Sequence, residues 1–163
     1  MRQVLFIVLS VVLLVIVVIG TISMIDLTPD PKWKDCKVKS VYSGNMMVLT
    51  ADNKKIVAKL AGVDAPESGQ PFYSMSYKFV KEVVDDQHCQ WAKITVDGDV
   101  EYGILRFDEG AHAGEELNGV VLRQGYGWWD PATSYNDELK ELETKARNEQ
   151  IGIWSVVEAD DGS

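Results

Sequence analysis

The chain has 163 residues, of which 46% are hydrophobic, so it is long enough to fold as one compact domain with a core of its own. Only Arg2 is charged before Asp26, and from Asp26 onward 15 basic residues face 25 acidic ones, a net charge of −10. Because Lys and Arg supply most of the non-specific affinity for nucleic acid, this balance disfavours a protein that binds DNA or RNA over a broad charged surface.

The chain opens with an uncharged segment that runs from Gln3 to Ile25. About 20 apolar residues are the length that a helix needs to span the hydrocarbon core of a bilayer. The alternative is a cleaved secretory signal, whose apolar region is usually shorter and ends at a cut site of small residues, for which Val18-Ile19-Gly20 is a weak match. We therefore predict a single-pass transmembrane anchor over residues 1–25, with the membrane contacted by residues 3–25.

The side of the membrane on which the domain lies is indicated by two opposing features. Residues 32–39 include four lysines, and the positive-inside rule would keep such a flank in the cytoplasm. Cys36 and Cys89 form a candidate disulfide if the domain is exported, and two buried free thiols are the alternative. Because short N-terminal anchors commonly act as export signals, we expect the domain on the extracytoplasmic side. Residues 26–35 are interpreted as a linker, since Pro29 and Pro31 disfavour helix and strand.

The first half of the domain has the pattern of a meander of three strands. Alternating apolar residues separated by turn residues predict strands at Cys36–Tyr42, Met46–Thr50 and Lys55–Ala61. A helix is predicted from Pro71 onward, because apolar residues recur there at steps of three and four. The residues of this stripe, which we expect to face the core, are Phe72, Met75, Phe79 and Val83.

The second half adds two strands and two helices. Strands are predicted at Gln90–Val96 and Val100–Phe107. A helix over Leu117–Gln124 ends at a glycine cap, and a last helix over Asn136–Asn148 carries apolar residues on one side. The cap is Gly125, and the apolar residues are Leu139, Leu142 and Ala146.

This order of elements predicts an α+β fold, a five-stranded OB-type β-barrel with three helices, preceded by one N-terminal transmembrane helix. The barrel domain would cover residues 36–155, and residues 156–163 would form an acidic, solvated tail.

Two carboxylates lie three residues apart where the third strand ends, at Asp64 and Glu67. An Asp that can hold a hard cation and a Glu that can activate water are the parts of a hydrolytic site. The surrounding segment, Leu60–Glu67, resembles the motif of the staphylococcal nuclease family, thermonuclease-like OB-folds. The resemblance extends from Cys36 to Trp154 through landmarks that include Tyr102-Gly103 and Gly152-Ile153-Trp154.

The resemblance implies a calcium ion between two aspartates, a glutamate that activates water and two arginines that bind the phosphate. Asp64 and Glu67 match the second aspartate and the glutamate. The first aspartate is matched by Asn45, and the arginines by Lys59 and Ile104. These changes remove one metal-binding charge, a planar phosphate fork and a whole positive charge, respectively. Any calcium site, from Asp64 and Asn45, would be weak or absent.

Arg106 is two residues beyond Ile104 on the same strand face, so it is a candidate replacement for the lost arginine, with an ordinary surface ion pair as the alternative. Tyr126, Trp128 and Trp129 are a candidate interaction surface, and packing between helices is the alternative. His88 and His112 stand alone in the sequence, which disfavours a zinc site.

These observations predict a membrane-anchored, nuclease-like domain with impaired catalysis that acts as a binding or assembly module, or as an accessory subunit of a membrane or envelope complex. Its partners would be proteins in or at a membrane. The alternative is an active Ca²⁺- or Mg²⁺-dependent nuclease, a hydrolase of DNA or RNA with Glu67 as general base and Lys59 and Arg106 as the phosphate clamp. Whether the protein is an enzyme stays open between these two hypotheses.

Overall fold

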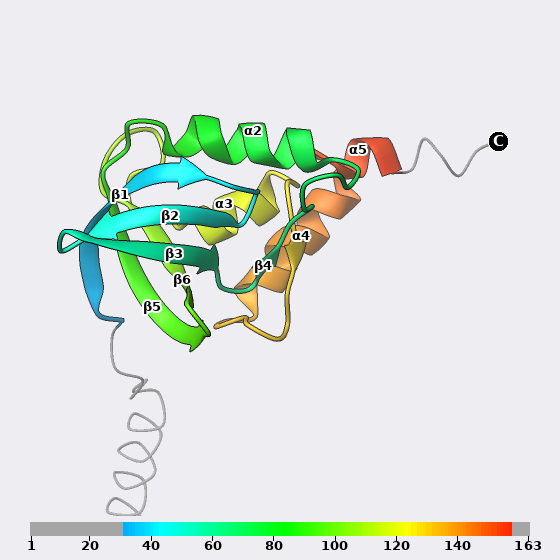
Figure 1. Ribbon diagram of the computed structural model, residues 1–163. Helices are drawn as coiled ribbons and strands as arrows, with labels where there is room; N and C mark the ends of the chain where they lie inside the picture. Colours follow the sequence, from blue (N-terminus) through cyan, green and yellow to red (C-terminus); the bar gives the residue numbers. More distant parts are fainter. Residues whose placement is uncertain (1–30, 158–163) are drawn as a thin grey trace, which may run out of the picture. The chain divides into compact units, whose positions relative to one another are not determined.

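The computed structural model describes residues 31–157, in which seven strands and four helices are found (Figure 1). The strands are β1 (Trp33–Val41), β2 (Met46–Ala51), β3 (Lys54–Leu60), β4 (Val63–Asp64), β5 (Cys89–Asp97), β6 (Val100–Phe107) and β7 (Trp128–Trp129). The helices are α2 (Tyr73–Val84), α3 (Leu117–Arg123), α4 (Glu138–Asn148) and α5 (Trp154–Val157). Within these described residues, no helix has the length and apolar character to cross a membrane. The predicted anchor, residues 26–30 of the predicted linker and residues 158–163 of the acidic tail lie outside the described residues.

Five strands close into a barrel in the order β1-β2-β3-β6-β5. β1 takes part in two antiparallel ladders, since its first residues pair with β5 and its later residues pair with β2. β3 and β6 pair in parallel, and β5 and β6 form a long antiparallel hairpin. The predicted five-stranded, OB-like α+β barrel is therefore confirmed.

The barrel interior follows from the alternation of side chains along each strand. In β2, Met47, Leu49 and Ala51 are buried, while the residues between them are partly exposed. A period of two is what a strand with one face against a core requires. The largest buried side chain, Trp91 of β5, donates its indole N–H to a carboxylate oxygen of Glu101 at 3.1 Å, so its polar atom is satisfied inside the fold.

Helix α2 lies along the upper side of the barrel in Figure 1, and the face that it buries only partly matches the predicted one. Its buried residues are Ser76, Val80 and Val84 rather than the predicted stripe. Phe79 and Val83 are half-buried and pack against the core, as predicted. Met75 is 37% exposed, because the fully buried face is shifted by one position. The reason is that Ser76 occupies an inner position, where its hydroxyl donates to the backbone oxygen of Tyr126 at 2.5 Å. A pattern of apolar residues cannot reveal a buried serine of this kind.

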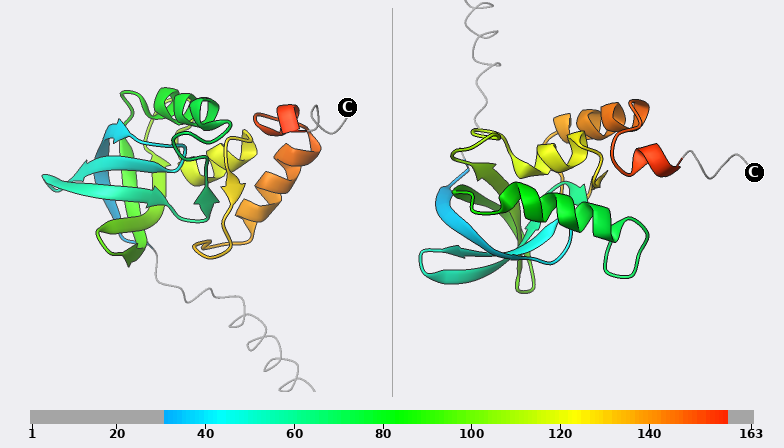
Figure 2. Two further views of the ribbon diagram at one scale, coloured as in Figure 1. Left: turned by 45° about the vertical axis from the view of Figure 1, so that its right-hand side comes forward. Right: turned by 90° about the horizontal axis from the view of Figure 1, so that it is seen from above.

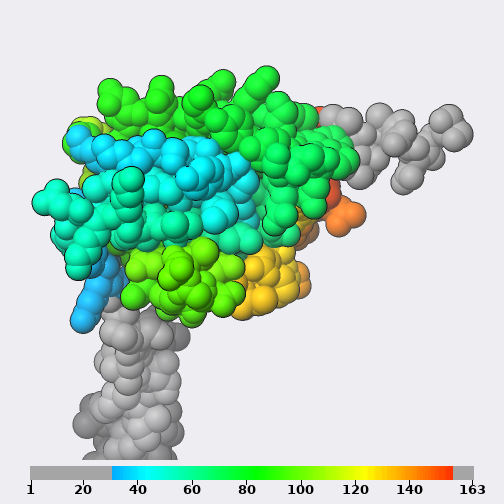
Figure 3. Space-filling view, in the orientation of Figure 1, coloured from blue at the N-terminus to red at the C-terminus, as the bar shows by residue number. Residues whose placement is uncertain are grey.

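Helices α3 and α4 lie side by side next to the barrel, as both views of Figure 2 show. Gly125 ends α3 with φ of 69°, and its N–H donates to the Leu122 oxygen, so the predicted glycine cap is confirmed. On the opposite side, the strands of the β1–β3 meander and α2 form one continuous surface (Figure 3). The fold thus consists of the barrel and of a helical layer formed by α3 and α4 next to it. Strands β4 and β7 pair with each other outside the barrel sheet.

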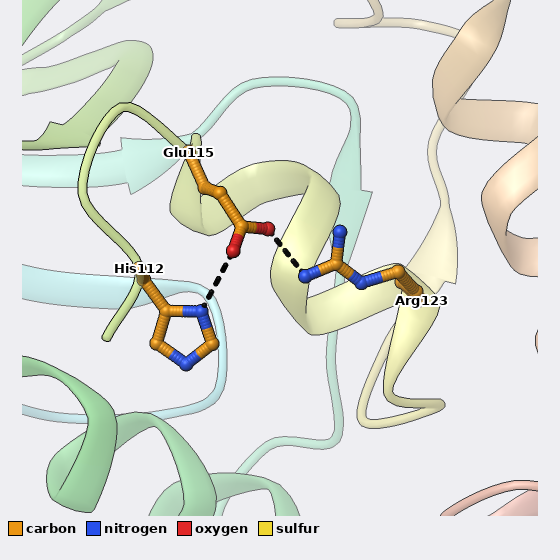
Figure 4. A network of polar contacts seen from close by, with 3 residues as sticks. All are labelled: His112, Glu115 and Arg123. Atoms are coloured by element: carbon orange, nitrogen blue, oxygen red, sulfur yellow. Dashed lines mark hydrogen bonds and ion pairs between the residues drawn. The ribbon is translucent and has the colours of Figure 1, made fainter.

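A small ionic network joins the loop before α3 to the end of that helix (Figure 4). The carboxylate of Glu115 accepts a hydrogen bond from Arg123, and a second oxygen of the same carboxylate lies 3.2 Å from Nδ1 of His112. The hydrogen bond from Arg123, together with that from His112, lowers the pKa of Glu115 below its ordinary value of 4.5, although burial acts in the opposite direction.

This network makes stability depend on pH in the acid range. A carboxyl whose pKa is lower in the folded state stabilises the fold above its unfolded pKa, and this contribution disappears as the pH falls through the folded pKa. We therefore expect Glu115→Gln to be less stable than the wild type at pH 7 and equal to it well below pH 4.5 in urea unfolding. The exposed Glu149→Gln is the matched control. A stability difference for Glu115→Gln that is the same at both pH values would contradict the role of this pair.

Candidate functional site

The turn between β1 and β2 places Asn45 in the interior, where it is 3% exposed. Its Nδ2 donates to the backbone oxygen of Val63 at 2.9 Å, and its Oδ1 accepts from the hydroxyl of Ser43 at 2.8 Å. Because a backbone carbonyl can only accept, the orientation of the amide is fixed. Both ends of the Asn45 amide are therefore used within the protein, and they join the turn to β4.

The same turn is held from two further directions. The backbone oxygen of Asn45 accepts the N–H of Leu60 at 2.8 Å. Gly44 lies so close to α2 that a Cβ there would approach Oγ of Ser76 to 1.7 Å. Only a residue without a side chain fits at this contact. The turn is thus fixed against β3, β4 and α2 at once.

The two predicted carboxylates lie at and after the end of β4 and are exposed. Oδ1 of Asp64 accepts the backbone N–H of Ala65 at 3.0 Å. The backbone N–H of Glu67 donates to Oε1 of Gln70 at 2.7 Å, which closes the loop that carries the glutamate. Since Asn45 binds Val63, the residue before Asp64, the structure brings the predicted metal positions together.

Lys59 reaches the same region through the β2–β3 ladder, in which it pairs with Met46, the residue after Asn45. Its Nζ lies 5.8 Å from the centre of the Tyr102 ring, at the long end of a cation–π contact. The predicted positions of Asn45, Lys59 and Asp64 therefore converge, as the resemblance implied.

Ile104 and Arg106 do not add a positive charge to this group. Ile104 is 3% exposed and pairs with Ala92 in the β5–β6 hairpin. The guanidinium of Arg106 donates to Oε1 of Gln90 at 2.6 Å, and its Cζ lies 3.9 Å from the centre of the Trp33 ring. Trp33 begins β1, whereas the turn with Asn45 follows the end of β1. Arg106 therefore lies near the start of β1, whereas the candidate site lies at the end of β1. Its contacts with Gln90 and Trp33 are those of a structural residue rather than of a phosphate clamp.

The donor set does not fit a calcium ion. Calcium takes 6–8 oxygen ligands, and its affinity depends on the number of carboxylates. The two metal-ligand positions of the family supply one carboxylate, Asp64, and an amide oxygen of Asn45 that already accepts a hydrogen bond from Ser43. Among residues 31–157, no group of three or more His, Cys, Asp and Glu side chains is arranged to hold a metal ion.

The predicted aromatic surface is largely used in packing. Tyr126 stacks on Phe79 with ring centres 4.2 Å apart, and Trp128 meets Trp154 edge to face at 6.5 Å. Trp129 donates its indole N–H to Ser134 at 3.0 Å. All three predicted residues are half-buried. In the β4–β7 ladder Trp128 pairs with Asp64, so part of this aromatic group lies beside the candidate site.

Cys36 and Cys89 are both buried and are free thiols in this structure. They are facing residues in the β1–β5 ladder. The histidines contact carboxylates, since His88 lies 3.9 Å from Glu109 and His112 contacts Glu115.

Three residues without a role in the sequence-based prediction also shape this region. Ser43 fixes the amide of Asn45, Tyr102 lies beneath Lys59, and Asn118 of α3 binds the backbone directly after β3 and in the middle of β6. A serine two residues before an asparagine in a turn is a local signal that could have identified the first. The other two depend on contacts between distant segments.

A closed OB-like barrel that carries an aspartate and a glutamate on the loop after its third strand is the frame of a nuclease-like domain. The family model described as "Staphylococcal nuclease homologue" matches residues 57–156, and the chain belongs to this family. The predicted family is thereby confirmed.

The chain is similar to three relatives that illustrate the range of the family. It is 27% identical over 137 residues to the "Micrococcal nuclease" of Shigella flexneri, which covers 77% of each chain. It is 25% identical over 126 residues to "Staphylococcal-like nuclease CAN1" of Arabidopsis thaliana, covering 74% of this chain and 38% of that one. An "Uncharacterized endonuclease" of Haemophilus influenzae is 25% identical over 122 residues, covering 74% and 66%.

Proposed function

We propose that this protein is a membrane-attached, nuclease-like domain with an impaired hydrolytic site, which acts as a binding or assembly module or as an accessory subunit of a membrane or envelope complex. The observation that carries the proposal is the buried amide of Asn45, held between Ser43 and Val63 at the position of a metal-binding aspartate. A side chain used in this way contributes no negative charge to a cation, and one of the two lone pairs of its oxygen is already occupied by Ser43.

The phosphate-binding side of the site supports the same proposal. Lys59 is a point charge and cannot grip two phosphate oxygens with a planar fork, and the buried Ile104 carries no charge. Loss of one preorganised electrostatic donor typically costs about 10²–10³ in rate. The three arginines of residues 31–157 are engaged elsewhere, since Arg106 contacts Gln90 and Trp33, Arg123 contacts Glu115 and Arg147 lies over the ring of Trp154.

The proposed location and partners rest on the sequence. The uncharged segment from Gln3 to Ile25 would anchor the chain, and the domain would lie on the extracytoplasmic side. The net charge of −10 beyond the segment favours protein partners over nucleic acid. Trp128, which is half-buried and pairs with Asp64, is the part of the aromatic group that such a partner would contact.

The second candidate is an active Ca²⁺- or Mg²⁺-dependent nuclease with Glu67 as general base. It is favoured by the names of the relatives and by the exposed carboxylates of Asp64 and Glu67, which have the family positions. In that case Glu67→Ala would abolish cleavage of DNA or RNA while the fold is retained.

Calcium binding separates the two candidates. For the full chain in detergent micelles, calorimetric titration with Ca²⁺ is expected to show no saturable binding in the micromolar range, because the two metal-ligand positions, Asn45 and Asp64, offer a single carboxylate. The controls are Asp64→Ala at the site and Asp99→Ala at the exposed β5–β6 turn. Micromolar affinity that disappears in Asp64→Ala and persists in Asp99→Ala would overturn the proposal.

A further inference from the structure

We propose that Cys36 and Cys89 form a disulfide that covalently closes the barrel between β1 and β5. This inference is independent of whether the domain hydrolyses nucleic acid. It concerns the two cysteines that the candidate site does not use.

The register of the barrel places the two residues directly opposite each other. Cys36 and Cys89 are Cα partners in the antiparallel β1–β5 ladder. Facing Cα atoms in such a ladder lie about 4.5 or 5.5 Å apart, depending on the kind of pair. A disulfide requires Cα atoms about 4.4–6.8 Å apart, so either kind of pair is within its range. Facing side chains also project to the same side of the sheet.

Both side chains point into the fold at the place where the barrel is closed. Cys36 is 5% exposed and Cys89 is 1% exposed, and both belong to the main core cluster. The β1–β5 ladder runs only from Trp33 to Cys36 on β1, and from Lys37 onward β1 pairs with β2. The cysteine pair is thus the last one of the short ladder that closes the sheet.

The bond would enclose the predicted metal and catalytic residues before Cys89 in one covalent loop. The segment between the two cysteines contains Asn45, Lys59, Asp64 and Glu67. A crosslink across a loop of this length restricts the unfolded chain strongly and so stabilises the native barrel. The crosslink would thereby also stabilise the turn between β1 and β2, which the hydrogen bonds of the Asn45 amide hold in place.

The reaction is a two-electron oxidation by thiol–disulfide exchange. The thiolate of one cysteine attacks a disulfide of the oxidant, either oxidised glutathione or the disulfide of a thiol oxidoreductase, and releases one thiol from it. The second cysteine then attacks the resulting mixed disulfide, forms the Cys36–Cys89 bond and releases the other thiol. Each cysteine loses its proton, and the oxidant is reduced to two thiols.

Burial determines when this step can occur. Desolvation, together with Asp108, raises the pKa of Cys89 to about 11. Desolvation also raises the pKa of Cys36, to about 12, with further contributions from Cys89 and Asp108. Since the thiolate is the attacking species, the folded, reduced domain reacts slowly. We therefore expect the bond to form while the chain folds, when both thiols are exposed.

A cavity of about 320 Å³ lies beside the cysteine pair. It is lined by both cysteines and by Thr50, His88 and Asp108.

The test is refolding of the full chain in detergent micelles in a buffer of reduced and oxidised glutathione. Free thiols are counted in denaturant, the intact mass is measured, and the melting temperature is compared with and without dithiothreitol. Expected are no free thiols, a mass lower by two hydrogens with no glutathione adduct, and a Tm that falls by about 10 °C on reduction.

The single variants Cys36→Ser and Cys89→Ser are the matched controls, with alanine in place of serine if a serine variant does not fold. Each is expected to keep one cysteine, free or as a glutathione adduct, and a Tm that does not respond to dithiothreitol. Wild-type chain that refolds with two free thiols, with two glutathione adducts or with a bond between two chains would overturn the proposal. A disulfide whose reduction leaves Tm unchanged would contradict the closure of the barrel.

Discussion

Replacement of Asn118 by alanine is expected to destabilise the domain by about 3–5 kcal/mol. The side chain is fully buried in α3. Its Nδ2 donates to the backbone oxygens of Ala61 at 2.8 Å and Gly103 at 3.0 Å, and its Oδ1 accepts the N–H of Leu105 at 3.2 Å. The variant removes this partner from the Ala61 oxygen and the Leu105 N–H in the interior, at about 1–3 kcal/mol each, whereas the Gly103 oxygen still accepts the N–H of Ala61. Urea unfolding monitored by tryptophan fluorescence measures the loss.

The control for this prediction is Asn148→Ala, which removes an exposed asparagine at the end of α4. It is expected to change the free energy of unfolding by less than about 0.5 kcal/mol. Asn118→Ala that costs no more than the control would mean that the helical layer is not joined to β3 and β6 by this side chain. Since these strands carry Lys59 and Tyr102, that result would also remove the explanation for their position.

Asn45→Asp is expected to destabilise the domain by about 2–4 kcal/mol at neutral pH. An ionised carboxylate cannot donate to the Val63 oxygen, which would then face a buried negative charge at a position that is 3% exposed. A protonated carboxyl can donate to Val63 and accept from Ser43, so the loss should decrease as the pH is lowered. Urea unfolding at pH 7 and pH 5 measures both effects.

The matched control is Asn53→Asp in the exposed β2–β3 turn, where the backbone has φ of 60°. Asn and Asp both tolerate this conformation, so little change in the free energy of unfolding is expected. If Asn45→Asp is as stable as the wild type at pH 7, the amide of Asn45 does not have the structural role assigned to it.

Millimolar Ca²⁺ should leave the unfolding midpoint of the wild type unchanged, because a ligand stabilises only a fold that binds it.

Most of the barrel could be predicted from the sequence because its strands alternate cleanly. The bounds of the strand Val100–Phe107 are the same in the prediction and in the structure. The first strand was predicted to begin at Cys36, although it begins at Trp33. Its first residues pair with β5, and no local pattern reveals a partner that lies so far along the chain.

The candidate site was predictable in its positions but not in its contacts. Asn45, Lys59 and Asp64 converge because a hairpin register and one hydrogen bond bring them together. That both ends of the Asn45 amide are used depends on the backbone of β4, which is distant in the sequence. Arg106 shares a strand face with Ile104, but its place is determined by Gln90 and Trp33.

The central claim is that the family frame is retained while its hydrolytic site is impaired. A cleavage assay of the full chain in detergent micelles tests it most directly, with single-stranded DNA and RNA in Ca²⁺ or Mg²⁺. Glu67→Ala is the matched variant, and the Shigella flexneri relative named micrococcal nuclease is the positive control. We expect the wild type to cleave no faster than Glu67→Ala. Metal-dependent cleavage by the wild type that is lost in a folded Glu67→Ala variant would show that the protein is an active nuclease and would contradict the claim.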